Sequence, residues 1–244
     1  MKFSKFFQRV TKNKYISELK NKKATYWIIG VSSAALLSCC LHANAAIANT
    51  TIQQAIQANA PSLSRNAIKL GVKAYNHAKN LGLDKQHILT IIDYSKPSSK
   101  QRLWVFDMRD GHVIHKTLVA HGTGSGMNNY ATKFSNQPHS NATSIGVFLT
   151  GSTYTGKHGY SMRLNGLDKG YNDKAYSRAV VMHSAWYVGK QFLAEHGRLG
   201  HSWGCTALSQ QDASKVISTI KNGTIMLSYY PNQQWERNST FLNA

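Results

Sequence analysis

Cysteine is scarce in this chain of 244 residues, which contains only three. Cys39 and Cys40 are adjacent and lie in an N-terminal apolar segment, so Cys205 is the single cysteine of the remaining sequence. A disulfide within that remaining part is therefore excluded. An isolated cysteine is either a small buried side chain without chemistry or a reactive thiol, and its sequence surroundings must decide between the two.

Acidic residues are also few, because 10 Asp and Glu stand against 29 Lys and Arg, which gives a formal net charge of +19. Such an excess favours polyanionic surroundings. The basic residues are scattered and form no nucleic-acid motif, so we expect no nucleic-acid partner. CxxC and HExxH patterns are missing, and the spacing from His196 to His201 does not suit one helical face. We therefore expect no metal site and no cofactor.

Long apolar runs are missing after residue 45, and only Ala24 to Leu41 approaches the length of a bilayer span. Residues 1–23, which precede it, carry eight Lys or Arg and one acid, and the small-residue site 43–45 follows it. This order is typical of a secretory signal over 1–45, which predicts export to the periplasm or cell envelope. Lipidation of Cys39 and a retained anchor, with transient membrane association through the signal, are the alternatives.

The sequence after the predicted signal has the length of one ordinary domain. Helix-like spacing over 51–60 and 64–80 precedes a region rich in short β segments. We divide the chain into a signal, a helical preface, a main domain and a polar C-terminal tail, over 1–45, 46–86, 87–231 and 232–244. Strands dominate the main domain and helices lie at its front and near its end, so the predicted class is β-rich α+β.

Within the main domain, apolar and β-branched runs predict strands at 88–94, 102–107, 113–119, 145–149, 178–182 and 224–230. Residues 122–141 form a polar stretch of about twenty residues, a length that a compact domain rarely keeps without a use. Residues 151–161, GSTYTGKHGYS, are predicted as a second loop. Short helices are predicted near 188–196 and from Ser209, an N-cap, to Gly223, a stop.

Cys205 ends a glycine-rich turn in which Gly200 and Gly204 allow the backbone to approach a ligand closely. An unreactive core cysteine more often lies inside an apolar strand, so we interpret Cys205 as a nucleophile. A free thiol has a pKa near 8.5 and needs a neighbouring base to react at neutral pH. The backbone N–H groups of such a turn are also suited to hold an oxyanion.

The base must lie upstream, because no histidine follows Cys205. This order excludes arrangements in which the thiol comes first in the chain. We prefer His183, which follows an apolar segment that predicts a rigid strand able to aim the side chain. The alternative for His183 is a hydrogen-bonded core histidine. The other upstream candidates are His121, His158, His196 and His201.

The segments VMHSAWYV and GRLGHSWGCTAL resemble the active-site region of the L,D-transpeptidase catalytic domains (YkuD-like), in the branch whose turn reads S-x-G-C. His183 and Ser184 match the first part of the family pattern, and the segment from Ser202 to Cys205 matches the second. The segments HGTGSG, FSN, SIGVF and GYSMRLNGLDKGYN are also similar to that branch. The resemblance covers about Ile88 to Tyr230.

Three features depart from the general family pattern. Trp203 replaces its second histidine, and the gap from His183 to Ser202 is longer. Neither Arg nor Asn directly follows the turn, where many relatives use one to hold the substrate. The thiol chemistry is unaffected by these changes, but the substrate contacts are left open. The candidates for those contacts are His121, Ser144, Gly146, Arg198, His201, Ser202 and Trp203.

The resemblance implies a β-sandwich or barrel with a helix after the catalytic turn, and a cysteine acyltransferase that acts on peptidoglycan stem peptides. Cys205, deprotonated by His183, would attack the carbonyl between L- and D-centres, and the terminal D-amino acid would leave. The N–H groups of Gly204 and Cys205 would hold the oxyanion, and the carbonyl of Ser184 would orient the imidazole. Release of the acyl group to an amine makes an L,D-transpeptidase, and release to water makes an L,D-carboxypeptidase.

Two further readings belong to other classes. The chain could be a non-catalytic module that binds the cell wall, although the intact set of Cys205, His183 and Gly204 argues against decay of a site. A sortase-like enzyme would need an Arg downstream of the cysteine, and the only one, Arg237, lies in the predicted tail. For an exported protein of this charge, anionic envelope polymers are expected neighbours.

Overall fold

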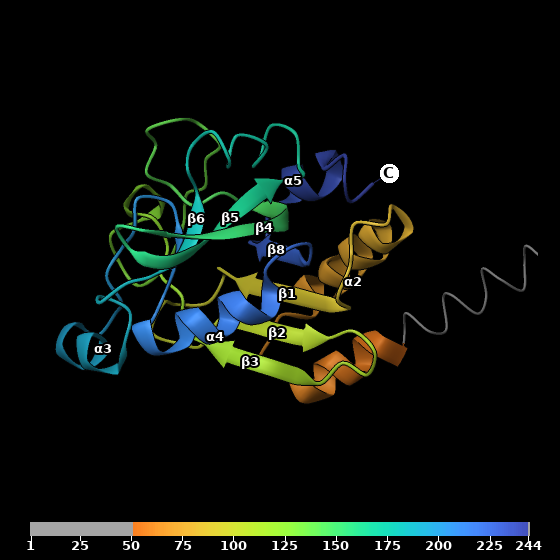
Figure 1. The fold of residues 1–244 in the computed structure, drawn as a ribbon, viewed down its shortest axis with the longest axis horizontal. Coiled ribbons are helices and arrows are strands. Elements are labelled where there is room, and N and C mark those ends of the chain that lie inside the picture. Colours follow the sequence, from red (N-terminus) through yellow and green to blue (C-terminus); the bar gives the residue numbers. More distant parts are fainter. Residues whose placement is uncertain (1–50, 244) are drawn as a thin grey trace, which may run out of the picture. The chain divides into compact units, whose positions relative to one another are not determined.

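The computed structural model describes residues 51–243, shown in Figure 1. The predicted signal over 1–45 and Cys39 lie outside the described residues, as does the start of the predicted helical preface. Within the described part, every helix is too short or too polar to cross a membrane.

Two helices come first, as the spacing predicts: one over 51–59 and α2 (Arg65–Asn80). Helix α2 buries a continuous face of small and aliphatic side chains that includes Ala67, Leu70 and Ala74. That face packs on the central strands of the sheet, and its residues belong to the same hydrophobic cluster. Because α2 shares this core, it is an integral layer of the domain and not only a preface.

A single sheet of eight strands forms the centre of the described residues, in the order β3-β2-β1-β8-β4-β5-β6-β7. Its strands are β1 (Ile88–Asp93), β2 (Leu103–Asp107), β3 (Val113–Thr117), β4 (Gly146–Gly156), β5 (Gly159–Gly166), β6 (Val181–Ser184), β7 (Thr206–Leu208) and β8 (Ile225–Tyr229). The pairs β1–β8 and β6–β7 are parallel, and the other neighbours are antiparallel.

The sheet is nearly closed on itself. Just after β3, at one edge, Ala120 forms an isolated bridge with Ala207 of β7, at the other edge. The Ala120 N–H donates to the Ala207 carbonyl at 2.9 Å. The prediction of a β-rich α+β fold with a barrel-like sheet is therefore confirmed.

Helices cover both faces of the central strands, which explains why those strands are apolar on both sides. In β1, Leu89 and Ile91 belong to the cluster with α2, whereas Ile88 and Ile92 belong to the cluster with α4 (Gln210–Ile220). Helix α2 contacts mainly β1 and β8, whereas α4 contacts mainly β5, β6 and β7. Helix α4 begins as predicted, because Ser209 caps it by accepting the Asp212 N–H at 3.0 Å.

The segment 151–161 was predicted as a loop, and this prediction is wrong. Residues 151–156 continue β4 and residues 159–161 begin β5, so the two strands form one long hairpin with its turn at 157–158. Its glycines and tyrosines gave the pattern of a loop. The turn is held against β6, because the Ser184 hydroxyl donates to the His158 carbonyl at 3.0 Å.

The strand predicted at 178–182 begins later, at Val181, and continues through His183 to Ser184. Ala179 causes this difference, since its φ of 55° lies in the left-handed region and interrupts an extended chain. Arg178 and Ala179 therefore lie in the turn that leads into β6.

The C-terminal residues were predicted as a polar tail over 232–244, and the structure corrects this. Residues Gln233–Asn238 form α5, and Trp235 is 0% exposed within the cluster that contains α2. The Trp235 indole N–H donates to the buried carboxylate of Asp168 at 3.2 Å, and the Ser239 hydroxyl donates to its other oxygen. The same carboxylate accepts the N–H of Val147 in β4 at 2.7 Å, so the C-terminal segment is tied to the sheet.

We predict that Trp235→Ala lowers the free energy of unfolding by about 3 kcal/mol or more, because it empties a fully buried site and removes one of the hydrogen bonds to the buried Asp168 carboxylate. Urea unfolding followed by circular dichroism measures this. Leu81→Ala, which truncates an exposed side chain, is the control and should change the stability by less than about 0.5 kcal/mol. Equal stabilities of the two variants would contradict the role given to Trp235.

Candidate functional site

The parallel pairing of β6 with β7 brings His183 close to the chain that carries Cys205. In this pair Met182 lies opposite Thr206 and His183 opposite Ala207, and Cys205 directly precedes β7. Both His183 and Cys205 line one cavity with a volume of about 680 Å³. This volume falls within the usual range for a ligand site.

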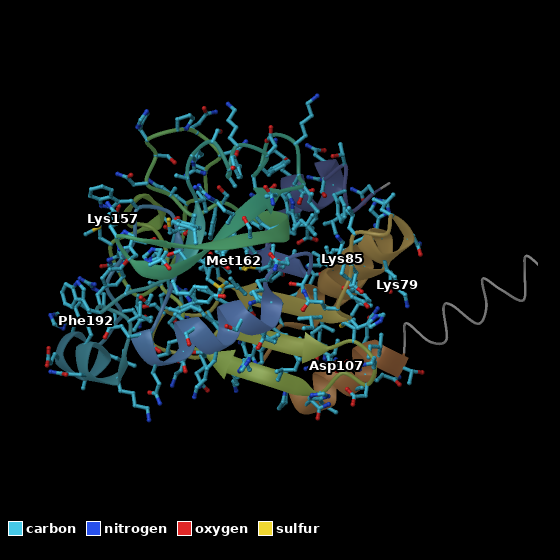
Figure 2. All side chains as sticks on the ribbon, in the orientation of Figure 1. Lys79, Lys85, Asp107, Lys157, Met162 and Phe192 are labelled. Atoms are coloured by element: carbon cyan, nitrogen blue, oxygen red, sulfur yellow. The ribbon has the colours of Figure 1, made fainter. Side chains whose placement is uncertain are left out.

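The wall of this cavity is basic. Lys157, Arg178 and four histidines, His139, His158, His183 and His201, contribute to it, and no Asp or Glu among residues 51–243 does so. Lys157 comes from the turn of the β4–β5 hairpin, and Figure 2 shows it at the same end of the fold as Phe192. The electrostatic field of such a wall favours an anionic ligand.

His183 is held in one orientation and is uncharged at neutral pH. Its Nδ1–H donates to the Ser184 carbonyl at 2.8 Å, the contact that the resemblance predicted, and this leaves Nε2 with a free lone pair. The His158 ring stacks on the imidazole with centroids 4.4 Å apart. Burial is the main cause that lowers the pKa of His183 below its ordinary 6.5, and the charge of His158 acts in the same direction. A neutral imidazole is the form that can accept a proton.

Cys205 is a free, partly exposed cysteine. Its thiol donates to the Ala179 carbonyl, with sulfur and oxygen 3.7 Å apart. Burial raises the pKa of Cys205 above that of a free thiol, while a hydrogen bond from the Val181 backbone and the charges of Arg178 and Lys157 act against this rise. Burial therefore favours a neutral thiol and a neutral imidazole on the wall of the same cavity.

Ser202 stabilises the turn before Cys205 through two hydrogen bonds. Its hydroxyl donates to the Cys205 carbonyl at 2.7 Å and accepts the Gly204 N–H at 3.2 Å. The use of the Gly204 N–H as an oxyanion donor, which the resemblance implied, would require this bond to open. Gly204 has a φ of 105°, and a Cβ there would lie 2.8 Å from the Ala142 carbonyl oxygen. Only glycine fits this position.

Arg178 is a residue of the site that sequence reasoning missed. Its guanidinium donates to the Ser135 carbonyl, the Ser144 hydroxyl, the Ser140 hydroxyl and the Ala142 carbonyl, at 2.6–3.2 Å. These four acceptors lie 34 to 43 residues away in the sequence, so no local pattern could have indicated them. Arg178 thereby fixes the long loop over the wall of the cavity.

Backbone strain is concentrated around the same cavity. Five residues other than glycine have a positive φ among those described, and three of them line the cavity: His139 (61°), Asn141 (51°) and Ala179 (55°). Such residues persist only where their surroundings hold them, and they are frequent at functional sites. The strain at Ala179 directs its carbonyl to the Cys205 thiol.

Three of the predicted substrate contacts lie on the cavity wall: His201, Ser202 and Trp203. Trp203 is 76% exposed and stands at the rim. The His201 ring packs edge-on against His121, with centroids 4.9 Å apart, and its Nε2 lies 3.2 Å from the Asn128 carbonyl oxygen.

Four other predicted contacts lie outside the cavity wall: His121, Ser144, Gly146 and Arg198. His121 is fully buried between Arg102 and the Gly126 carbonyl, and burial followed by the charge of Arg102 lowers its pKa to about 3. The Ser144 hydroxyl accepts a hydrogen bond from Arg178, and Gly146 lies against Asn172 and Asp168. Arg198 donates to the Leu199 carbonyl at 2.9 Å.

The profile of the L,D-transpeptidase catalytic domain family matches residues 59–229 of this chain. This segment contains His183, Cys205 and the whole eight-stranded sheet, and it includes α2. A comparison with curated protein sequences gives no match.

Solved structures with a similar fold include L,D-transpeptidases from three bacteria. The chain is 16% identical to one from Mycobacterium smegmatis, with a TM-score of 0.37, covering 59% of each chain. One from Mycobacterium tuberculosis H37Rv gives 16% identity and a TM-score of 0.37, over 59% of this chain and 58% of that one. One from Enterococcus faecium gives 16% and 0.34, over 60% of this chain and 50% of that one. The match thus spans about half to three fifths of those chains.

We predict that alkylation of Cys205 by iodoacetamide accelerates with rising pH through a midpoint above 9, because burial raises the pKa of this thiol and only the thiolate reacts. The rate is measured by mass spectrometry of the peptide that contains Cys205, which separates it from Cys39 and Cys40. A midpoint below 8 would show a thiolate already present at rest and would contradict this description.

We predict that Arg178→Met moves this midpoint further up, because the variant loses a positive charge near the sulfur. Arg178→Lys should move it less, since it retains the charge while losing most of the hydrogen bonds to the loop. The same alkylation assay, on variants whose circular dichroism matches the parent, measures both. If the folded Arg178→Met variant keeps the parental midpoint, Arg178 does not influence the thiol.

Proposed function

This chain belongs to the family of L,D-transpeptidase catalytic domains, and we propose that it is a cysteine acyltransferase that acts on peptidoglycan stem peptides. The observation that carries the proposal is the pairing of β6 with β7, by which His183 and Cys205 line the same cavity. An imidazole and a thiol arranged in this way are the parts that covalent catalysis by cysteine needs.

The first step is the attack of Cys205 on the amide carbonyl between an L- and a D-centre of the stem. His183 Nε2 takes the proton of the thiol as the C–S bond forms, because its Nδ1 is occupied by the Ser184 carbonyl. The raised pKa of Cys205 and the lowered pKa of His183 both favour the neutral pair before the substrate binds. His183 therefore acts as a general base on the thiol during the attack.

The attack converts the amide carbonyl into a tetrahedral oxyanion, for which we propose the Cys205 N–H as a donor. The Gly204 N–H joins it when its bond to Ser202 opens. The intermediate collapses when the C–N bond breaks, and the amine of the terminal D-amino acid takes the proton from His183. A thioester between the stem peptide and Cys205 remains.

The thioester is released when an amine from a second stem, or water, attacks it. His183 accepts a proton from the attacking group, and the Cys205 sulfur leaves. An amine yields a cross-linked product, so the enzyme is an L,D-transpeptidase, and water yields a trimmed stem, so it is an L,D-carboxypeptidase. Incubation with purified muropeptides followed by mass spectrometry separates the two, because the cross-linked and trimmed products differ in mass.

The charge of the cavity supports the choice of substrate. Stem peptides carry carboxylates, and the wall presents Lys157 and Arg178 without an acidic side chain among the described residues. The guanidinium of Arg178 is occupied by the loop, so Lys157, on the hairpin turn, is the better candidate for a substrate carboxylate. Export through the predicted signal would bring the chain to this substrate in the cell envelope.

We predict that a β-lactam of the carbapenem type forms a covalent adduct on Cys205, because opening of its strained ring traps the thioester. Intact-protein and peptide mass spectrometry detect the added mass and its position. Cys205→Ala should form no adduct, and His183→Asn should form it about a hundredfold more slowly or worse, which is the usual contribution of a general base.

The matched control is His112→Asn, which changes an exposed histidine in the β2–β3 turn and should leave the rate unchanged. If the parent forms no adduct and muropeptides stay intact, a non-catalytic wall-binding module becomes the better description.

A further inference from the structure

A group of aromatic rings lies on the surface around α3 (Lys190–His196), and we call Trp186, Phe192 and His196 the aromatic patch. Trp186 is 74% exposed, although tryptophan is on average among the well-buried residues. The Trp186 and Phe192 rings meet edge to face with centroids 5.7 Å apart. The rings of Phe192 and His196 stack at 4.0 Å and 8°.

Core packing does not explain this arrangement. Helix α3 has no buried residue, and it packs against a hydrophobic cluster of the described residues through Leu193, whereas Phe192 and His196 belong to none of these clusters. The rings instead support each other in fixed orientations at the surface. Exposed apolar groups that are held in this way commonly mark a binding surface.

The patch is continuous with the cavity through Tyr187. The Tyr187 side chain lines the cavity, and its ring lies 5.8 Å from that of Trp186. The Tyr187 backbone is fixed to the turn before Cys205, because its carbonyl accepts the Gly200 N–H at 3.0 Å. A Cβ at Gly200 would lie 2.6 Å from the Tyr187 Cβ, so this connection is tightly packed.

We propose that the aromatic patch binds the sugar strand from which the stem peptide branches, while the stem lies in the cavity. The proposal rests on the proposed function, since it places the rest of the same substrate. A pyranose ring presents a face of C–H groups, which packs on an aromatic ring, and polar edges, which need hydrogen-bond partners. The patch offers aromatic rings for the C–H face, and Gln191 and Glu195, which lie beside the rings on α3, offer hydrogen-bonding groups for the polar edges. These two side chains are hydrogen-bonded to each other at 3.0 Å.

The dimensions of the patch agree with this occupant. Each residue of an extended peptide spans at most about 3.3–3.6 Å, so two or three residues between the attacked carbonyl and the sugar reach about 10 Å. From Tyr187 on the cavity wall, the rings of Trp186 and Phe192 follow in steps of 5.8 and 5.7 Å. A stem that passes Tyr187 therefore has the length to bring its sugar to the patch.

The experiment measures binding of a peptide-free oligomer of N-acetylglucosamine to the full chain, by isothermal titration calorimetry. Cys205→Ala should bind the sugar as the parent does, because the patch does not involve the thiol. Trp186→Ala should weaken binding by about tenfold or more, as expected for a central aromatic contact. Because Trp186 is exposed, this variant is expected to fold, and circular dichroism verifies it.

Leu81→Ala is the matched control, because it removes an exposed apolar side chain next to Lys79, which Figure 2 shows at the opposite end of the fold from Phe192. It should bind the sugar as the parent does. The proposal is overturned if the parent does not bind the oligomer, or if folded Trp186→Ala binds it with parental affinity.

Two other occupants of the patch are tested in parallel. Co-sedimentation with vesicles of phosphatidylglycerol that depends on Trp186, without sugar binding, would assign the patch to a lipid surface. Self-association in analytical ultracentrifugation that Trp186→Ala abolishes, again without sugar binding, would assign it to a second copy of the chain. The carbapenem adduct on Cys205 is measured separately, so failure of the acyl-enzyme and failure of sugar binding are distinguished.

Discussion

The parallel pairing of β6 with β7 is the contact on which the site depends. His183 and Cys205 come from segments separated by α3 and a glycine-rich turn, and the ladder between the two strands brings them together. In a strand, a shift of one residue turns every side chain to the other face. The register that places Met182 opposite Thr206 therefore decides whether imidazole and thiol share a cavity at all. The other hydrogen bonds and charges at the site act on two side chains that the sheet has already brought to one cavity.

His183 and Cys205 both favour their neutral forms. Burial disfavours both the imidazolium and the thiolate, so it lowers the pKa of His183 and raises that of Cys205. The charges of Arg178 and Lys157 limit the rise at the sulfur. A neutral pair makes the thiol less prone to oxidation, because the thiolate is the reactive form. In the proposed mechanism the proton must therefore move during the attack, which makes the orientation of His183 by the Ser184 carbonyl important.

The sequence singled out Cys205, alone in a glycine-rich turn, and His183, after an apolar strand, and the structure places both on the wall of one cavity. It was misleading where local composition and long-range packing disagree. The segment 151–161 has the glycines and tyrosines of a loop, yet pairing with its neighbours makes it a hairpin. Trp235 lies in a polar segment, yet it is buried in the cluster with α2 and its indole binds Asp168, 67 residues away. Arg178 likewise acts through acceptors that only the fold brings near.

The loop over 122–141 shows how such long-range contacts hold an irregular segment in place on the cavity wall. Apart from the short helix η1 (Thr123–Ser125), it has no regular structure, yet Pro138, His139 and Asn141 line the cavity. Two of these three residues have a positive φ, which an isolated chain would avoid. The hydrogen bonds of Arg178 to residues 135–144 oppose that cost. The same guanidinium lies near the Cys205 sulfur. Arg178 therefore both opposes the rise in the pKa of the thiol and fixes the loop that forms part of the cavity wall.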